Sequence, residues 1–184
     1  MKSLSLYLVI LLLNSSFAQT LSDSSKRESR SMDKYGFYVK IGDTIPNITF
    51  NLDDKSTISL LDLRGKVVLL QFTASWCGVC REEMPHIERD LWQKYKDKGL
   101  YVLGVDYDEP LSKVKKFKKQ IKITYPLALD PEAKIFTHFA EKYSGVTRNV
   151  VLDQSGKVIY LTRLFKIEEF NLMVEAIEKQ LEIK

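Results

Sequence analysis

The hydrophobic residues of this chain fall into short runs whose spacing predicts alternating strands and helices. Residues 67–72 form a nearly continuous apolar run, which is typical of a strand buried on both faces. Residues 82–96 repeat apolar side chains at helical intervals between charged ones, and residues 100–105 are again apolar. A strand, a helix and a strand at this spacing predict two parallel strands joined by a right-handed crossover.

The other hydrophobic runs complete an α/β pattern. Hairpins are expected over residues 48–60 and 150–161, the second with a turn that contains glycine. The best assembly of these elements is a central mixed sheet flanked by helices. Further helices are predicted around Val114, Phe117 and Ile121, directly after Asp130 and Pro131, and over residues 170–181.

The helix that contains Val114 is rich in lysine. Two interpretations remain open: a solvated helix with a narrow apolar stripe, or a docking surface for an acidic partner. The lysines concerned are Lys113, Lys115, Lys116, Lys118, Lys119 and Lys122.

Composition limits the chain to one full-sized domain. Its 184 residues include 45% hydrophobic and 28% charged side chains, which is enough for a real core but leaves no room for a second large domain. The formal net charge of +4 is too small to indicate a nucleic-acid binder. The two cysteines lie within five residues, so they cannot form a disulfide scaffold, and their chemistry must be local.

The N-terminal residues have the pattern of a cleaved secretory signal. Lys2 precedes the apolar run 4–13, and small residues before position 18 predict a signal peptide over residues 1–18. An uncleaved anchor is the alternative, although the run is shorter than the roughly 20 residues that cross a bilayer. Residues 19–37, rich in serine and charge, predict a flexible leader, and residues 38–184 the folded domain. No cysteine near the cut could be lipidated, so a periplasmic or secreted protein without a membrane span is expected.

The motif Cys77-Gly78-Val79-Cys80 predicts thiol redox chemistry. It follows a buried strand and begins a helix, where free backbone N–H groups and the helix dipole lower the pKa of a thiol. Cys77 is therefore expected to be the reactive thiolate, with Cys80 shielded one turn deeper as the resolving thiol. Covalent haem attachment would require histidine where Arg81 stands. A zinc site would have only His86 and His138 as further ligands, and an inert disulfide this short would stabilise little.

Residues 65–85, with Trp76-Cys77-Gly78-Val79-Cys80 and Pro85, resemble the active-site strand and helix of the thioredoxin-like family in its extracytoplasmic TlpA/ResA branch. Residues 41–46, 123–130 and 150–153 are similar to further parts of that branch. The resemblance implies a thioredoxin-like fold with an N-terminal β-hairpin extension and a helical insert. It also implies that Cys77 is the nucleophile and that Pro85 bends the helix.

The resemblance assigns roles to further residues. Glu83 is expected to exchange a proton with Cys80, the alternative being a solvent-facing carboxylate. Gln71 stands where thioredoxin has a buried aspartate, which leaves more of the proton transfer to Glu83. Thr147 replaces the family's cis-proline, so its peptide bond is either a strained cis bond or a trans bond. The residues expected to contact substrate are Trp76, Gly78, Val79, Val146 and Thr147.

These features predict an extracytoplasmic thiol-disulfide oxidoreductase. The resemblance favours a monomeric disulfide reductase that works through a mixed disulfide, without cofactor or metal. Its expected partners are protein disulfides, apocytochrome c among them, and a membrane thiol-electron donor. One alternative is a peroxiredoxin-like peroxide reductase, although Ala74 stands where that chemistry usually has threonine. The other is a non-enzymatic binding or haem-handling module.

Overall fold

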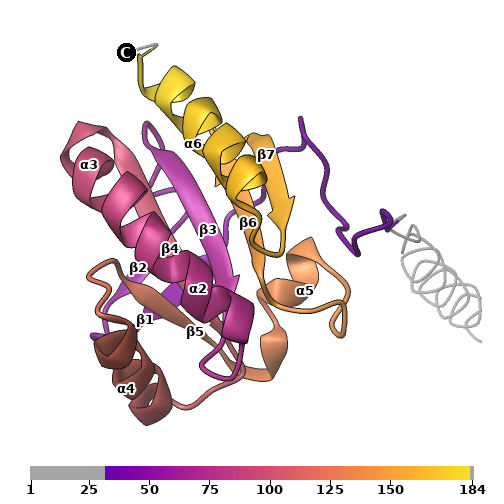
Figure 1. Ribbon diagram of the computed structural model, residues 1–184. Coiled ribbons are helices and arrows are strands. Elements are labelled where there is room, and N and C mark those ends of the chain that lie inside the picture. Colours follow the sequence, from indigo (N-terminus) through magenta and orange to yellow (C-terminus); the bar gives the residue numbers. More distant parts are fainter. Residues whose placement is uncertain (1–31, 183–184) are drawn as a thin grey trace, which may run out of the picture. The chain divides into compact units, whose positions relative to one another are not determined.

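The computed structural model describes residues 32–182. The predicted signal peptide and residues 19–31 of the predicted leader lie outside this part of the chain. The strands within it form one mixed sheet in the order β2-β1-β5-β4-β3-β6-β7 (Figure 1). Their bounds are β1 Thr49–Leu52, β2 Thr57–Ser59, β3 Val67–Thr73, β4 Leu100–Tyr107, β5 Leu127–Asp130, β6 Arg148–Leu152 and β7 Val158–Arg163.

The centre of the sheet confirms the predicted crossover unit. β3 pairs in parallel with β4 over its whole length and antiparallel with β6 on its other side. Every residue of β3 is buried, as its continuous apolar run predicts. Both predicted hairpins are present, β1 with β2 and β6 with β7. β5, for which the periodicity indicated no separate strand, links the first hairpin to β4.

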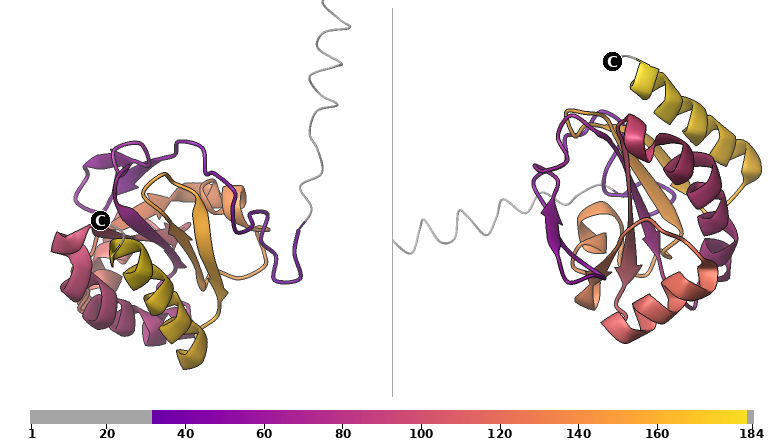
Figure 2. Two further views of the ribbon diagram at one scale, coloured as in Figure 1. Left: turned by 90° about the horizontal axis from the view of Figure 1, so that it is seen from above. Right: turned by 90° about the vertical axis from the view of Figure 1, so that its left-hand side faces the viewer.

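Helices cover both faces of the sheet, as expected. α2 (Gly78–His86), α4 (Leu111–Ile121) and α6 (Ile167–Glu182) lie on one face, and α5 (Phe136–Phe139) lies on the other (Figure 2). The alternation along β3 explains this division: Phe72 packs against Phe136 and Phe139 of α5, and its neighbour Gln71 faces α2. A 3₁₀ turn, Pro131–Ala133, precedes α5.

The helical run that begins after Cys77 is longer and less regular than its periodicity predicts. α2 passes into a π-helical segment, Ile87–Trp92, then α3 (Gln93–Tyr95) and a 3₁₀ turn, Lys96–Lys98. The change follows Pro85, which lies inside α2 and has no N–H to donate to the preceding turn. Gly99 ends the run in the left-handed conformation and leads directly into β4.

The start of the described chain packs on the domain. Phe37 is buried and forms an isolated β-bridge with Ala140. The guanidinium of Arg148 stacks on the Phe37 ring at 4.4 Å and donates to the carbonyl oxygens of Tyr35 and Ser144. Residues 33–37, assigned to the leader by composition, thus contact the residues that lead into β6.

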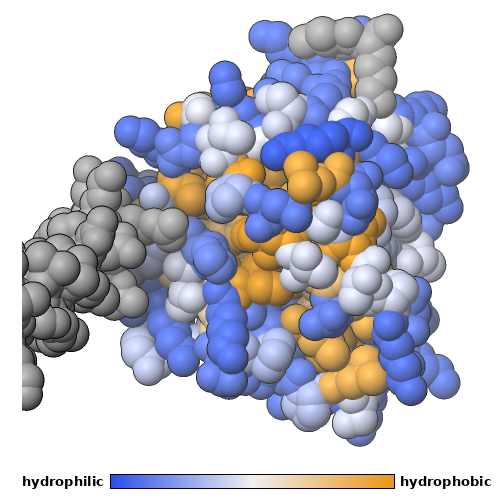
Figure 3. Space-filling view, turned by 180° about the vertical axis from the view of Figure 1, so that it is seen from behind, coloured by the Kyte–Doolittle hydropathy of each residue, from blue (hydrophilic) through white to orange (hydrophobic). Residues whose placement is uncertain are grey.

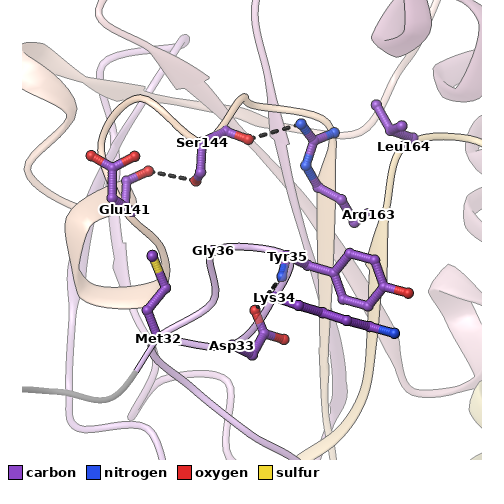
Figure 4. Close-up of a pocket in the computed structure, with 9 residues that line it drawn as sticks. All are labelled: Met32, Asp33, Lys34, Tyr35, Gly36, Glu141, Ser144, Arg163 and Leu164. Atoms are coloured by element: carbon purple, nitrogen blue, oxygen red, sulfur yellow. Dashed lines mark hydrogen bonds between the residues drawn. The ribbon is translucent and has the colours of Figure 1, made fainter.

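A pocket of about 410 Å³ lies beside this segment (Figure 4). Arg163 at the end of β7 points into it and donates to the carbonyl of Ser144 at 2.8 Å. Seen from behind, the described surface is mainly hydrophilic, with hydrophobic areas between hydrophilic residues (Figure 3). No helix within residues 32–182 is long and apolar enough to cross a membrane. The pocket is lined by Met32, Asp33, Lys34, Tyr35, Gly36, Glu141, Ser144, Arg163 and Leu164.

Candidate active site

Cys77 and Cys80 form a disulfide at the start of α2. Cys77 is the N-cap residue of the helix, and its sulfur accepts a hydrogen bond from the backbone N–H of Cys80 at 3.1 Å. Cys77 is 8% exposed and Cys80 is fully buried. Cys77, the less buried of the two, is therefore also the cysteine at the positive end of the helix dipole, where a thiolate is stabilised.

The loop before Cys77 is hydrogen-bonded to Glu109, which lies just after β4. The backbone N–H and the hydroxyl of Ser75 both donate to the carboxylate of Glu109, at 2.6 and 2.7 Å. Lys113 forms an ion pair with the same carboxylate at 2.5 Å. Burial alone would raise the pKa of Glu109, but the hydrogen bonds from Lys113 and Ser75 lower it. Glu109 is thus a carboxylate that fixes the backbone two residues before the reactive cysteine.

Asp106 lies next to Glu109 and is completely buried at the end of β4. Neither of its carboxyl oxygens accepts a hydrogen bond from the described residues. Burial, together with the negative charge of Glu109, raises the pKa of Asp106 to about 8. Asp106 is therefore largely protonated at neutral pH, which avoids two adjacent buried charges.

Thr147 lies against both sulfurs. Its hydroxyl oxygen is 3.0 Å from the sulfur of Cys77 and 3.2 Å from that of Cys80. The described residues contain no cis peptide bond, so the bond before Thr147 is trans. Its carbonyl accepts the N–H of Leu164 at 2.9 Å. The position that holds proline in the related family thus presents a side-chain hydroxyl to the disulfide.

Glu83 is buried, 2% exposed, on the face of α2 that packs against the sheet. Its two carboxyl oxygens accept hydrogen bonds from the side-chain amides of Gln71 at 3.0 Å and Asn149 at 2.6 Å. Burial raises the pKa of Glu83 to about 7, although both hydrogen bonds act in the opposite direction. A group with this pKa can take up or release a proton near neutral pH.

The comparisons agree with this geometry. The model of the Redoxin family matches residues 40–181. The chain belongs to the Redoxin family. Within it, this redoxin is a thioredoxin-like protein of the TlpA/ResA type and a thiol-disulfide oxidoreductase with a Cys77–Cys80 pair. It is 35% identical over 121 residues to a thiol-disulfide oxidoreductase ResA of Bacillus cereus, a match that covers 66% of this chain and 68% of the relative.

Two solved structures share the fold of this redoxin. A solution structure of a candidate protein disulfide isomerase from Bacteroides thetaiotaomicron is 51% identical, with a TM-score of 0.78, covering 80% of this chain and 93% of that one. A crystal structure of a candidate thiol:disulfide interchange protein DsbE from Chlorobium tepidum is 27% identical, with a TM-score of 0.68, covering 78% and 99%. The predicted thioredoxin-like fold, with its β-hairpin extension and helical insert, is confirmed.

The structure of the redoxin brings most of the predicted site residues together. Trp76, 61% exposed, packs edge-on against Tyr107, with the ring centroids 6.4 Å apart. Gly78 and Val79 form the first turn of α2, with Gly78 exposed and Val79 partly buried. Val146 is buried directly before Thr147. Trp76 and Gly78 are thus the surface residues nearest the disulfide in the sequence.

Other residues of the redoxin's site had no local signal in the sequence. Glu109 and Asp106 lie about 30 positions from the cysteine motif, Asn149 lies on β6, and Tyr125 lies in the loop before β5. Only strand pairing could have found Asn149, which lies opposite Gln71 in the register of β3 and β6. Residues 32–182 contain no cluster of three or more side chains suited to hold a metal.

Proposed function

We propose that this redoxin is an extracytoplasmic, monomeric protein-disulfide reductase that acts through a mixed disulfide. The observation that carries the proposal is the asymmetry of the pair: Cys77 caps the helix and is 8% exposed, whereas Cys80 lies in the first turn of the helix and is completely buried. The predicted signal peptide over residues 1–18 supports an extracytoplasmic location. We also propose a leader over residues 19–37 and a folded domain over residues 38–184, with the end of the leader, residues 33–37, packed on that domain.

The reaction starts from the reduced pair. The thiolate of Cys77 attacks one sulfur of a substrate disulfide, forms a bond to it and expels the other substrate sulfur as a thiolate. Cys80 then attacks the sulfur of Cys77, which closes the Cys77–Cys80 disulfide and releases the second substrate sulfur. The redoxin loses two electrons and, from its two thiols, two protons; the substrate gains the two electrons, and its two sulfurs take up two protons from the solvent. A membrane thiol-electron donor reduces the pair again.

Glu83 is proposed as the base for Cys80. The two residues are three positions apart on α2, which places them on the same face, and both are buried. Because its pKa is about 7, Glu83 can accept the Cys80 proton before Cys80 attacks. Trp76, Gly78, Val79, Val146 and Thr147 are proposed to contact the substrate polypeptide around the disulfide. Apocytochrome c belongs to this class of substrate.

A trapping experiment tests the mechanism. A Cys80→Ser variant cannot resolve the intermediate, so it should accumulate a mixed disulfide with a disulfide-containing protein substrate. Cys77→Ser should form none and lose turnover. Trapping through Cys80 instead would contradict the assigned roles. Peroxide consumption that matches disulfide reduction would favour the peroxiredoxin-like alternative, and tight partner binding by the double serine variant would favour a binding module.

The reduction potential tests the direction. Equilibration with glutathione measures the potential of the Cys77–Cys80 pair. A potential of about −270 mV fits a reductant, and one of about −120 mV fits an oxidant. We expect the first. A potential in the oxidising range would leave the oxidoreductase assignment intact and overturn the reductase direction.

A further inference from the structure

A row of buried side-chain hydrogen bonds ends on Glu83. The hydroxyl of Tyr125 donates to the side-chain oxygen of Gln71 at 2.7 Å, and the side-chain nitrogen of Gln71 donates to Glu83 at 3.0 Å. Tyr125 and Gln71 are both completely buried. Tyr125 therefore contacts one end of an amide whose other end contacts the carboxyl group.

Gly104 gives the Tyr125 ring its space. In the register of the sheet, Gly104 of β4 lies directly opposite Gln71 of β3. A Cβ atom at Gly104 would lie 3.4 Å from the Tyr125 ring and 2.3 Å from the Leu127 side chain. A residue with a side chain at this position would crowd both neighbours. The bare glycine thus allows the tyrosine to lie beside Gln71 in the middle of the sheet.

The amide of Gln71 has two orientations, and they suit different forms of Glu83. With nitrogen toward Glu83 it donates to an ionised carboxylate, which only accepts hydrogen bonds. With oxygen toward Glu83 it would accept from the protonated acid. That second orientation turns the Gln71 nitrogen toward Tyr125, and the buried tyrosine proton loses its acceptor. A buried donor without an acceptor is costly, so the tyrosine hydroxyl favours the first orientation.

We propose that Tyr125 is a positioning residue that acts through Gln71 to keep an N–H group directed at Glu83, and so favours the ionised form of that carboxyl. The inference rests on the proposed proton exchange between Glu83 and Cys80, which it deepens. Around Glu83, the other donor is Asn149 of β6, which also donates to Thr162 of β7 at 2.8 Å.

The titratable groups near Glu83 are few. Tyr125 is one, and its own pKa is raised well above the usual value by burial and by the negative charges of Glu83 and Glu88. Cys80 is the other, one turn earlier on α2 and bonded to Cys77 in the oxidised protein. Burial raises the pKa of Glu83 and the two amides lower it, without a contribution from any charged side chain of the described residues. Loss of the Tyr125 hydroxyl is therefore expected to affect the titration of Glu83 through the side-chain amide of Gln71.

The test is a carboxyl titration of the oxidised protein, full chain, labelled with ¹³C-glutamate. The Glu83 resonance is identified by its absence in Glu83→Gln. Tyr125→Phe keeps the ring beside Gly104 and removes only the hydroxyl, so we expect the Glu83 midpoint to rise by roughly one pH unit. Tyr95→Phe is the matched control, because it removes a tyrosine hydroxyl that donates to Glu178 instead. In Tyr95→Phe, the Glu83 midpoint should equal that of the wild type.

A double variant tests the route through Gln71. In a Gln71→Leu background, Tyr125→Phe should cause no further shift of the Glu83 midpoint. An unchanged midpoint in Tyr125→Phe, or a shift that persists in the Gln71→Leu background, overturns the proposal. The wild type gives a second check that needs no substitution: the side-chain amide resonances of Gln71 should titrate with the Glu83 midpoint. Amide resonances that do not respond would also overturn it.

The rate of disulfide reduction against pH separates this inference from the proposed function. If the midpoint and the rate profile move together in Tyr125→Phe, both stand. If the carboxyl midpoint rises and the rate profile stays in place, the positioning by Tyr125 stands and the role of Glu83 as base for Cys80 fails.

Discussion

The hydroxyl oxygen of Thr147 lies 3.0 Å from the sulfur of Cys77, although 70 positions separate the two residues. In the reduced protein this hydroxyl can donate to a Cys77 thiolate. A hydrogen bond to an ionised group stabilises it more than a bond between neutral groups. Thr147 and the helix dipole therefore favour the same charged form of Cys77.

Thr147→Val should make Cys77 less acidic. The substitution removes the hydroxyl and nearly keeps the shape, so the pKa of the Cys77 thiol should rise by about one unit. Loss of thiolate stabilisation also disfavours the reduced state, so the reduction potential should fall by roughly 30 mV. Thiolate absorbance against pH and equilibration with glutathione measure the two effects. The control is Thr137→Val, at a half-buried threonine on α5 whose hydroxyl donates to the carbonyl of Lys134, and equal values for both variants would contradict the prediction.

Glu83→Gln should change the pH dependence of stability. The pKa of Glu83 is raised from 4.5 to about 7, so the folded state binds its proton more tightly than the unfolded chain. Its contribution is fully present below pH 4.5 and is lost as the pH rises through 7. Relative to wild type, the variant should gain on the order of 3 kcal/mol of unfolding free energy between pH 4 and pH 8.

Urea unfolding of both proteins at a series of pH values measures this gain. The oxidised form must be used throughout, because reduction adds two titrating thiols. A difference between variant and wild type that stays constant over the range would show that Glu83 has the same pKa in both states.

Asp106→Asn should stabilise the protein at alkaline pH. Burial and the negative charge of Glu109 raise the pKa of Asp106 from 3.8 to about 8, so the folded state binds its proton more tightly than the unfolded chain, and this stabilisation is full below pH 3.8 and lost as the pH rises through 8. Asparagine keeps the shape and cannot ionise. Relative to wild type, the variant should gain on the order of 4 kcal/mol of unfolding free energy between pH 5 and pH 9, from thermal or urea unfolding. Exposed Asp97→Asn controls for the amide substitution, and an equal gain at both pH values would refute the charge argument.

Leu164→Gly should stabilise the protein slightly. Leu164 has a φ of 67°, in the left-handed region that is costly for a residue with a side chain, and is 43% exposed. Relief of that cost outweighs the greater freedom of glycine in the unfolded chain, for a net gain of about 0.5–1 kcal/mol. Leu61→Gly is the matched control: this exposed turn leucine lies outside the left-handed region and should lose stability when replaced. A loss at both positions would contradict the prediction.

The fold was largely predictable, because its elements have strong local patterns. The buried run of β3, the helix after the cysteines and the two hairpins follow from periodicity and turn residues. β5 was not indicated as a strand, because it is short and, unlike β1 and β2, has no hairpin partner beside it in the sequence; it pairs with β1 and β4. The π-helical turn at Ile87 was also outside prediction, because it depends on how the helix packs after Pro85.

The candidate active site was likewise predictable in part from the sequence. The sequence by itself determined the reactive pair and its polarity, because Cys77, Cys80 and the helix that follows are contiguous in the chain. Only the tertiary structure decided that Glu83 is buried and that the peptide bond before Thr147 is trans, with the Thr147 hydroxyl against the two sulfurs. It also decided that the Tyr125 hydroxyl donates to Gln71. These contacts join residues far apart in the chain, and strand register and burial, which no local pattern contains, bring them together.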